Sequence, residues 1–289
     1  MNVCVRPIKA FRSPDGALFF HAKAGTNCIT LPCGQCVECR LKRSREWAAR
    51  CMHEASQFVD NCFVTLTYRD DTAVSLDYRD FQLWMKRLRK RFPNNKIRFY
   101  MCGEYGEINN RPHFHVCLFN FNFPDRVRFG KLYRSAILEE LWPYGFSTIG
   151  NVTFESAAYV ARYIMKKVTG DLSDEHYRHV DPDTGVVTQR TPEFCHMSLK
   201  PGIGAGWIDK YRSDVFPDGR MVVRGSETNS ARYYDKLYRR VDRDRYEAMK
   251  EKRMLQSVGV KVLDKTPKRL EVREKVVNAR VGLLKRNSF

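Results

Sequence analysis

The sequence lacks an apolar run long enough to span a bilayer, and it contains no internal repeat and no low-complexity linker. A membrane-spanning helix needs about 20 consecutive apolar residues, so we expect no such helix. Neither end carries an amphipathic basic helix, which argues against a membrane partner. The first residues are interrupted by Arg6, Pro7 and Lys9, unlike a secretory signal peptide. We therefore expect a cytoplasmic protein.

Acidic residues are scarce. Asp and Glu number 33 against 51 Lys and Arg, which gives a formal net charge of +18. This excess favours a polyanionic partner, because basic side chains neutralise phosphates and release counterions. Solubility explains the excess poorly, since added acids would serve it at least as well. Nucleic acid is the first candidate partner.

The hydrophobic patterns predict alternating strands and helices in the middle of the chain. Strands are expected over residues 62–68, 96–105, 112–121 and 146–154, and helices over residues 40–58, 77–92, 131–142 and 155–168. From residue 62 onward the order is β-α-β-β-α-β-α. Its first six elements match the split βαβ arrangement of a ferredoxin-like domain, an antiparallel sheet with helices on one face. The predicted fold class is α+β.

Domain boundaries follow from changes in this pattern. Residues 1–60 form a Cys-rich segment with a basic helix, residues 61–170 a catalytic core, and residues 171–289 a basic C-terminal extension. Within the extension, residues 233–256 have the composition of a charged helix, whereas residues 261–289 give no clear signal.

Two histidines in one predicted strand are candidate metal ligands. Alternation along the strand directs His113 and His115 to one face. If the hairpin is symmetric about residues 108 and 109, Glu104 lies opposite His113, and Glu107 is the fallback ligand if the turn is skewed. Such mixed ligands suit manganese, magnesium or zinc. The alternative is a pair of half-exposed histidines without metal, but polar residues inside an apolar strand need partners.

Two tyrosines in the predicted helix 155–168 are candidate nucleophiles. Tyr159 and Tyr163 are four residues apart and therefore share a helix face, with Lys166 and Lys167 following. A phenol needs activation, which a neighbouring ammonium group and a metal-polarised phosphate would supply. The alternative is that both tyrosines only pack against the sheet.

Three motifs in order resemble the HUH superfamily of rolling-circle replication initiators, and within it the microvirus initiators. They are the strand motif at residues 63–67, the His-Phe-His motif at residues 113–115 and the Tyr-Tyr-Lys motif at residues 159–167, and the resemblance covers residues 25–170. It implies a metal-dependent endonuclease that nicks the origin of double-stranded replicative-form DNA. One tyrosine keeps the 5′ phosphate, the freed 3′ hydroxyl primes synthesis, and the displaced strand is rejoined into a circle.

The same resemblance implies roles for individual residues. Tyr159 and Tyr163 are the nucleophiles, whereas His113, His115 and Glu104 hold magnesium or manganese. Either Lys166 or Lys167 contacts the phosphate. The implied partners are origin DNA and the helicase and polymerase of the host, in the bacterial cytoplasm.

The ten cysteines, in a reducing compartment, are expected to be thiols or metal ligands. Cys33, Cys36 and Cys39 could hold a structural zinc with Cys28 or Cys51 as the fourth ligand. We do not favour this site, because only one tight cluster is present and cysteine is common as a small buried residue.

Basic side chains are expected to contact backbone phosphates of DNA. The candidates are Arg40, Lys42, Arg43, Arg87, Arg89, Lys90 and Arg91. Basic charge alone would also fit a DNA-binding or packaging protein without enzymatic activity, which would leave the two motif sets as coincidence. A plasmid replication protein or a transposase would share the chemistry and differ in its target DNA.

Overall fold

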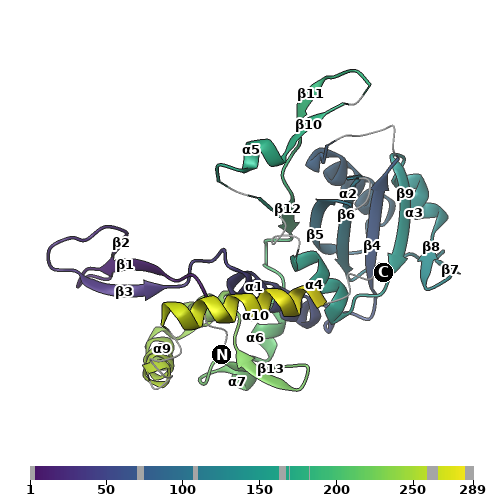
Figure 1. The fold of residues 1–289 in the computed structure, drawn as a ribbon. Helices are drawn as coiled ribbons and strands as arrows, with labels where there is room; N and C mark the ends of the chain where they lie inside the picture. Colours follow the sequence, from purple (N-terminus) through teal and green to yellow (C-terminus); the bar gives the residue numbers. More distant parts are fainter. Residues whose placement is uncertain are drawn as a thin grey trace. The chain divides into compact units, whose positions relative to one another are not determined.

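The structure, a computed structural model, describes residues 4–69, 75–106, 110–162, 167–168, 170–181, 183–258 and 266–283. The chain divides into two compact units. One comprises residues 44–243 and holds the large sheet (Figure 1). The other combines residues 1–43 with residues 244–288, so segments from both ends of the chain belong to one unit. None of the helices in the described part combines the length and apolar character needed to cross a bilayer.

The large sheet has seven antiparallel strands in the order β12-β5-β6-β4-β9-β8-β7. Its centre contains the four strands expected from the sequence, β4 (Asn61–Tyr68), β5 (Arg98–Tyr105), β6 (Pro112–Phe119) and β9 (Gly145–Gly150). Their order, β5-β6-β4-β9, is that of a ferredoxin-like domain. The predicted α+β class with an antiparallel sheet is confirmed.

The crossover helices α2 (Tyr78–Arg91) and α3 (Ala136–Leu141) pack on one face of this sheet, as expected. Trp84 and Leu88 of α2 and Leu138 of α3 are buried there against alternate strand residues such as Phe114. The opposite face is also covered, which the sequence did not indicate. There α1 (Val37–Ala55) and α4 (Phe154–Arg162) bury Cys51 and Val160 in a second apolar cluster.

Helix α2 follows its sequence signals closely. Asp77 is its N-cap and accepts a hydrogen bond from the Arg79 amide over 2.7 Å, and Phe92 is its C-cap. Basic residues occupy its last turn, where the helix dipole favours them. Helix α1 begins at Val37, slightly before the predicted start, and part of the predicted helix 155–168 lies outside the described residues.

Two helix predictions were wrong in extent. The expected helix 131–142 is interrupted, because β7 (Val127–Phe129) and β8 (Leu132–Arg134) form a hairpin in which Gly130 adopts a φ of 62°. Helix α3 starts only after Ser135, whose hydroxyl accepts a hydrogen bond from the Leu138 amide. The charged helix 233–256 is two helices, α8 (Arg232–Val241) and α9 (Arg243–Val258), separated by Asp242 in an extended conformation.

The region beyond residue 170, where sequence signals were weak, adds an edge strand, β12 (Phe194–Met197), to the large sheet. Its other elements within residues 44–243 are α5 (Ser173–His176), β10 (Arg178–Val180), β11 (Val187–Gln189), α6 (Ala205–Lys210), α7 (Arg212–Val215), β13 (Arg220–Val223) and β14 (Ser226–Asn229).

The other unit contains a small antiparallel sheet in the order β2-β1-β3. These strands are β1 (Ile8–Arg12), β2 (Leu18–Phe19) and β3 (Asn27–Leu31). The last described helix, α10 (Pro267–Leu283), belongs to the same unit and accounts for much of the segment that gave no clear sequence signal.

Candidate active site

The candidate metal ligands lie on adjacent central strands. In the register of β5 and β6, Glu104 pairs directly with His113, as the symmetric hairpin predicted. His115 is two residues further along β6 and therefore points to the same face, the one on which α4 packs. Glu107, the fallback ligand, lies outside the described residues.

The three side chains converge on one point. Glu104 Oε1 lies 3.0 Å from His113 Nε2 and 2.9 Å from His115 Nε2. A metal with ligand bonds of about 2.1 Å and right-angled geometry holds neighbouring donor atoms about 3.0 Å apart. Glu104 is 1% exposed and His115 7% exposed, so the set is preformed in the sheet and largely shielded from water. Two imidazole nitrogens and a carboxylate oxygen fit a divalent cation, with further coordination positions left for a substrate oxygen.

The second nitrogen of each imidazole is also engaged. His113 Nδ1 lies 3.0 Å from the Arg111 carbonyl oxygen, and His115 Nδ1 lies 3.0 Å from Thr65 Oγ1 on β4. Such outer contacts fix the ring orientation and leave Nε2 for a metal. The sequence interpretation missed Thr65 as part of the site. Strand alternation within the motif at residues 63–67 could have found it, since Thr65 pairs directly with His115.

The charge of Glu104 is matched by its neighbours. Burial by itself raises the pKa of the Glu104 carboxyl, but the hydrogen bonds and positive charge of His113 and His115 outweigh it and hold the pKa below its ordinary value. Glu104 is therefore a carboxylate at neutral pH, as metal binding requires.

Tyr159 reaches this site from α4. The helix begins with a reciprocal cap, in which the Thr153 amide donates to Ser156 Oγ over 2.8 Å and the Ser156 amide donates to Thr153 Oγ1 over 3.1 Å. The helix then carries the half-buried Tyr159 over the sheet. Its hydroxyl lies 3.5 Å from Glu104 Oε1, and its ring meets that of His115 edge to face at 5.0 Å.

The remaining residues of the tyrosine motif are described only in part. Tyr163 and Lys166 lie outside the described residues, whereas Lys167 is described and exposed. Their predicted roles therefore rest on sequence alone.

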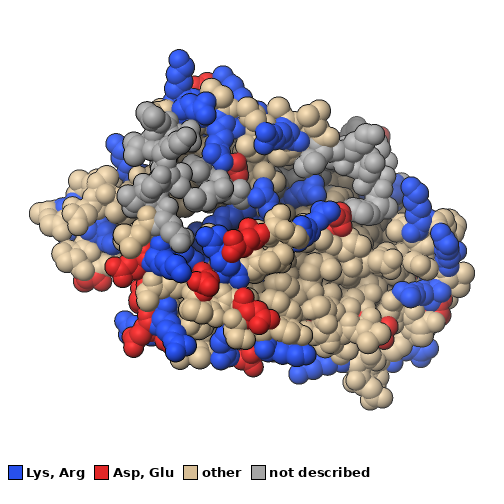
Figure 2. All heavy atoms as spheres, turned by 90° about the horizontal axis from the view of Figure 1, so that it is seen from below, with Lys and Arg blue, Asp and Glu red and all other residues tan. Residues whose placement is uncertain are grey.

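The candidate DNA-binding residues of α2 do not join the site, because α2 packs on the other face of the sheet. Arg87 donates to the Leu141 carbonyl over 3.0 Å and Arg89 to the Ile97 carbonyl over 3.1 Å, whereas Lys90 and Arg91 are exposed. Arg40, Lys42 and Arg43 lie in the first turns of α1, in the other unit. On the face seen in Figure 2, basic side chains lie in several groups with acidic side chains among them.

The cysteine cluster has a different fourth member from the two considered. Cys4 joins Cys33, Cys36 and Cys39. Cys28 is exposed, and Cys51 is fully buried in the apolar cluster beneath α1, so the suggestion that one of them completes the set is wrong. Cys4 carries no local spacing signal, because it is remote in sequence from the other three.

Comparison with known proteins identifies the family. The family described as replication-associated protein ORF2 matches residues 61–168, which include the strands and helix of the site. The replication-associated protein VP4 of Bdellovibrio phage phiMH2K is 34% identical over 82% of this chain and 77% of its own. The replication-associated protein ORF2 of Spiroplasma virus 4 is 30% identical over 78% of this chain and 73% of its own, and ORF4 of Chlamydia phage 1 is 28% identical over 81% and 61%. No solved structure matches. The chain therefore belongs to the family of replication-associated proteins of microvirus-type phages.

Proposed function

We propose that the protein initiates rolling-circle replication by nicking one strand of the phage origin and attaching itself to the 5′ phosphate through a tyrosine. The observation that carries this proposal is the convergence of Glu104, His113 and His115 beside the Tyr159 hydroxyl on one face of the sheet. A family of phage replication-associated proteins supports DNA as the substrate.

A divalent cation, magnesium or manganese, would be held by Glu104, His113 and His115, where it would polarise a phosphate oxygen and make the phosphorus more electrophilic. The Tyr159 oxygen attacks that phosphorus and releases its proton to water. A new oxygen–phosphorus bond forms, the bond from phosphorus to the 3′ oxygen breaks, and the 3′ oxygen takes a proton from water. Because the phosphodiester energy is kept in the tyrosine link, a free 3′ hydroxyl can later reverse the step and rejoin the strand.

The other motif residues have supporting roles in this scheme. Tyr163 acts after one round of synthesis, when Tyr159 still holds the first 5′ end. Lys166 or Lys167 contacts the scissile phosphate and offsets its charge. The basic residues of α1 and α2 bind DNA backbone, and the helicase and polymerase of the host extend the freed 3′ end in the bacterial cytoplasm.

The direct test is to incubate the full chain with supercoiled phage DNA and manganese, and then to separate the products by denaturing electrophoresis. The expected product is a nicked circle carrying covalently bound protein, which is absent when a chelator replaces manganese. A DNA-binding or packaging protein without enzymatic activity would retard the same DNA and leave it supercoiled. A linearised or nicked product free of protein would contradict the tyrosine mechanism.

A further inference from the structure

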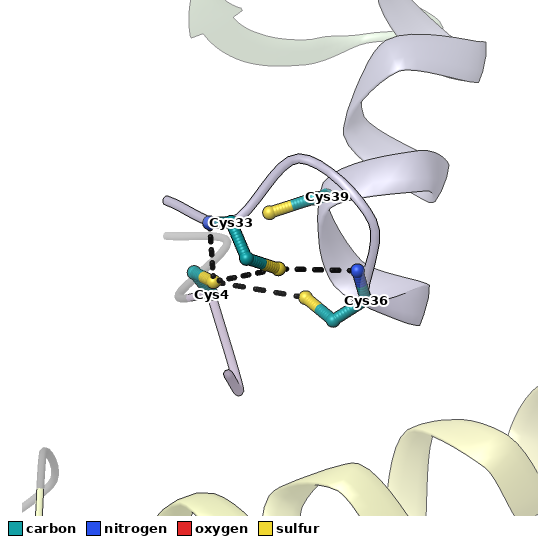
Figure 3. Close-up of side chains that lie close together, drawn as sticks. All are labelled: Cys4, Cys33, Cys36 and Cys39. Atoms are coloured by element: carbon teal, nitrogen blue, oxygen red, sulfur yellow. Dashed lines mark hydrogen bonds between the residues drawn. The ribbon is translucent and has the colours of Figure 1, made fainter. Parts of the chain in front are cut away.

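A second group of metal-ligand side chains lies around the start of α1, outside the candidate active site. The Sγ atoms of Cys4, Cys33, Cys36 and Cys39 all lie within 4.8 Å of one another. Figure 3 shows them pointing toward a common centre from the N-terminal segment, the turn before α1 and the first turn of the helix. All four are free thiols.

We propose that these four cysteines bind one structural zinc ion as thiolates. Zinc binds thiolates tetrahedrally with bonds of about 2.3 Å, which places neighbouring sulfur atoms about 3.8 Å apart. Cys4 Sγ lies 3.6 Å from Cys33 Sγ and 3.7 Å from Cys36 Sγ, close to that spacing. A set of four thiolates closes the coordination sphere, which is typical of structural rather than catalytic zinc sites.

The turn between Cys33 and Cys36 is built to present sulfur. Gly34 adopts a φ of 76°, a conformation that other residues rarely take, and allows the chain to fold back over Cys33. The amides of Gln35 and Cys36 then donate to Cys33 Sγ over 3.4 Å and 3.2 Å, and the Cys33 amide donates to Cys4 Sγ over 3.3 Å. Amide donors stabilise negative charge on sulfur and orient the ligand atoms.

The helix itself favours thiolates at this place. The Arg40 amide donates to the Cys36 carbonyl over 3.0 Å, so Cys36 is the residue at which α1 begins, and Cys39 lies in its first turn. The positive end of a helix dipole lowers the free energy of anions placed there.

The unit that contains the cluster has little else to hold it together. Among its described residues the buried apolar side chains are Val5, Ala10, Cys36, Met249 and Leu270. Both large apolar clusters of the chain lie within residues 44–243. Small units with so few buried apolar groups usually rely on a metal or another cross-link.

The cluster also lies next to the contacts that bring the two chain segments of this unit together. Arg6, close to Cys4, pairs with Glu274 of α10 at 2.8 Å. Glu38, between Cys36 and Cys39, pairs with Arg273 of α10 at 3.5 Å. A zinc ion that fixes the positions of the four cysteines would therefore also fix the residues to which α10 attaches.

The test is zinc analysis of the full chain, purified without chelator from cells grown with zinc. We expect about one tightly bound zinc per chain at the cysteines. The ion should persist in Cys28→Ser, a matched control in the same unit, and in His113→Ala, which disables the other candidate metal site. The double variant Cys33→Ser/Cys36→Ser should lose it.

A cobalt measurement on the unaltered protein covers the case in which that double variant does not fold. Zinc replaced by cobalt should give thiolate-to-cobalt charge transfer in the near ultraviolet and the intense visible bands of a tetrahedral site. A wild-type chain that holds no zinc and shows no such bands would overturn the proposal. Zinc retained in full by the double variant would overturn it as well.

Discussion

Thr65→Val removes a single hydroxyl from beneath the candidate metal centre. Valine has nearly the same shape, so the packing of β4 is kept. In the native chain Thr65 Oγ1 lies 3.0 Å from His115 Nδ1. When His115 Nε2 holds a metal, Nδ1 carries a hydrogen and Thr65 is its acceptor.

The magnitude follows from the burial of His115, which is 7% exposed. A buried N–H group left without an acceptor costs about 1–3 kcal/mol. Loss of an outer contact of this kind typically weakens metal binding by about 10- to 100-fold, which corresponds to about 1.4–2.7 kcal/mol. The two estimates agree, so we expect the manganese dissociation constant to rise by about that factor in Thr65→Val.

The assay is a manganese titration followed by calorimetry, with nicking measured in parallel. Saturating manganese should restore most of the nicking rate, because the substitution affects affinity and leaves the tyrosine in place. Thr67→Val is the control, since Thr67 pairs with His113, whose Nδ1 instead lies against the Arg111 carbonyl. An unchanged dissociation constant in Thr65→Val, or an equal loss in Thr67→Val, would rule out this role for the Thr65 hydroxyl.

Further predictions concern the ligands, the nucleophiles and one buried histidine. His113→Ala or His115→Ala should slow nicking by at least about a hundredfold while salt-sensitive DNA binding remains, because metal polarisation and phosphate neutralisation are separate contributions; equal nicking in manganese-restored buffer would exclude the assigned ligands. Tyr159→Phe and Tyr163→Phe should each still cut a short single-stranded origin oligonucleotide, whereas circle release should suffer in both and the double variant should form no adduct; adduct in the double variant would contradict this. Burial lowers the pKa of His53 from 6.5 to about 4, so the neutral form stabilises the fold above pH 6.5 and this contribution is lost as the pH falls toward 4. Urea unfolding should show about 2 kcal/mol less of this acid loss between pH 7 and pH 5 in His53→Gln, and an identical pH dependence would count against the assignment.

Local signals in the sequence predicted the central strands and the metal ligands well. Alternation placed His113 and His115 on a common face, and hairpin symmetry placed Glu104 opposite His113. Both depend only on neighbouring residues and on the geometry of a β-hairpin. The capped helix α2 was predictable for the same reason, since Asp77 and the basic last turn are local features.

Contacts between distant segments could not be predicted in this way. No local pattern indicates that Cys4 joins Cys33, or that β12 adds to the edge of the sheet beside β5. The helix expected over residues 131–142 failed because Gly130 favours a tight hairpin just ahead of it, a turn signal that competes with the helical spacing of the apolar residues.

The proposed mechanism requires that Tyr159 of α4, or Tyr163 after it in sequence, becomes linked to DNA at the site formed by Glu104, His113 and His115. Mass spectrometry of the protein–DNA adduct, after nuclease and protease digestion, identifies the linked residue. We predict a nucleotide 5′ phosphate on Tyr159 or Tyr163, formed only with a divalent cation. A nucleotide on any other residue, or an adduct formed equally well by His113→Ala in the presence of a chelator, would show that the mechanism is wrong.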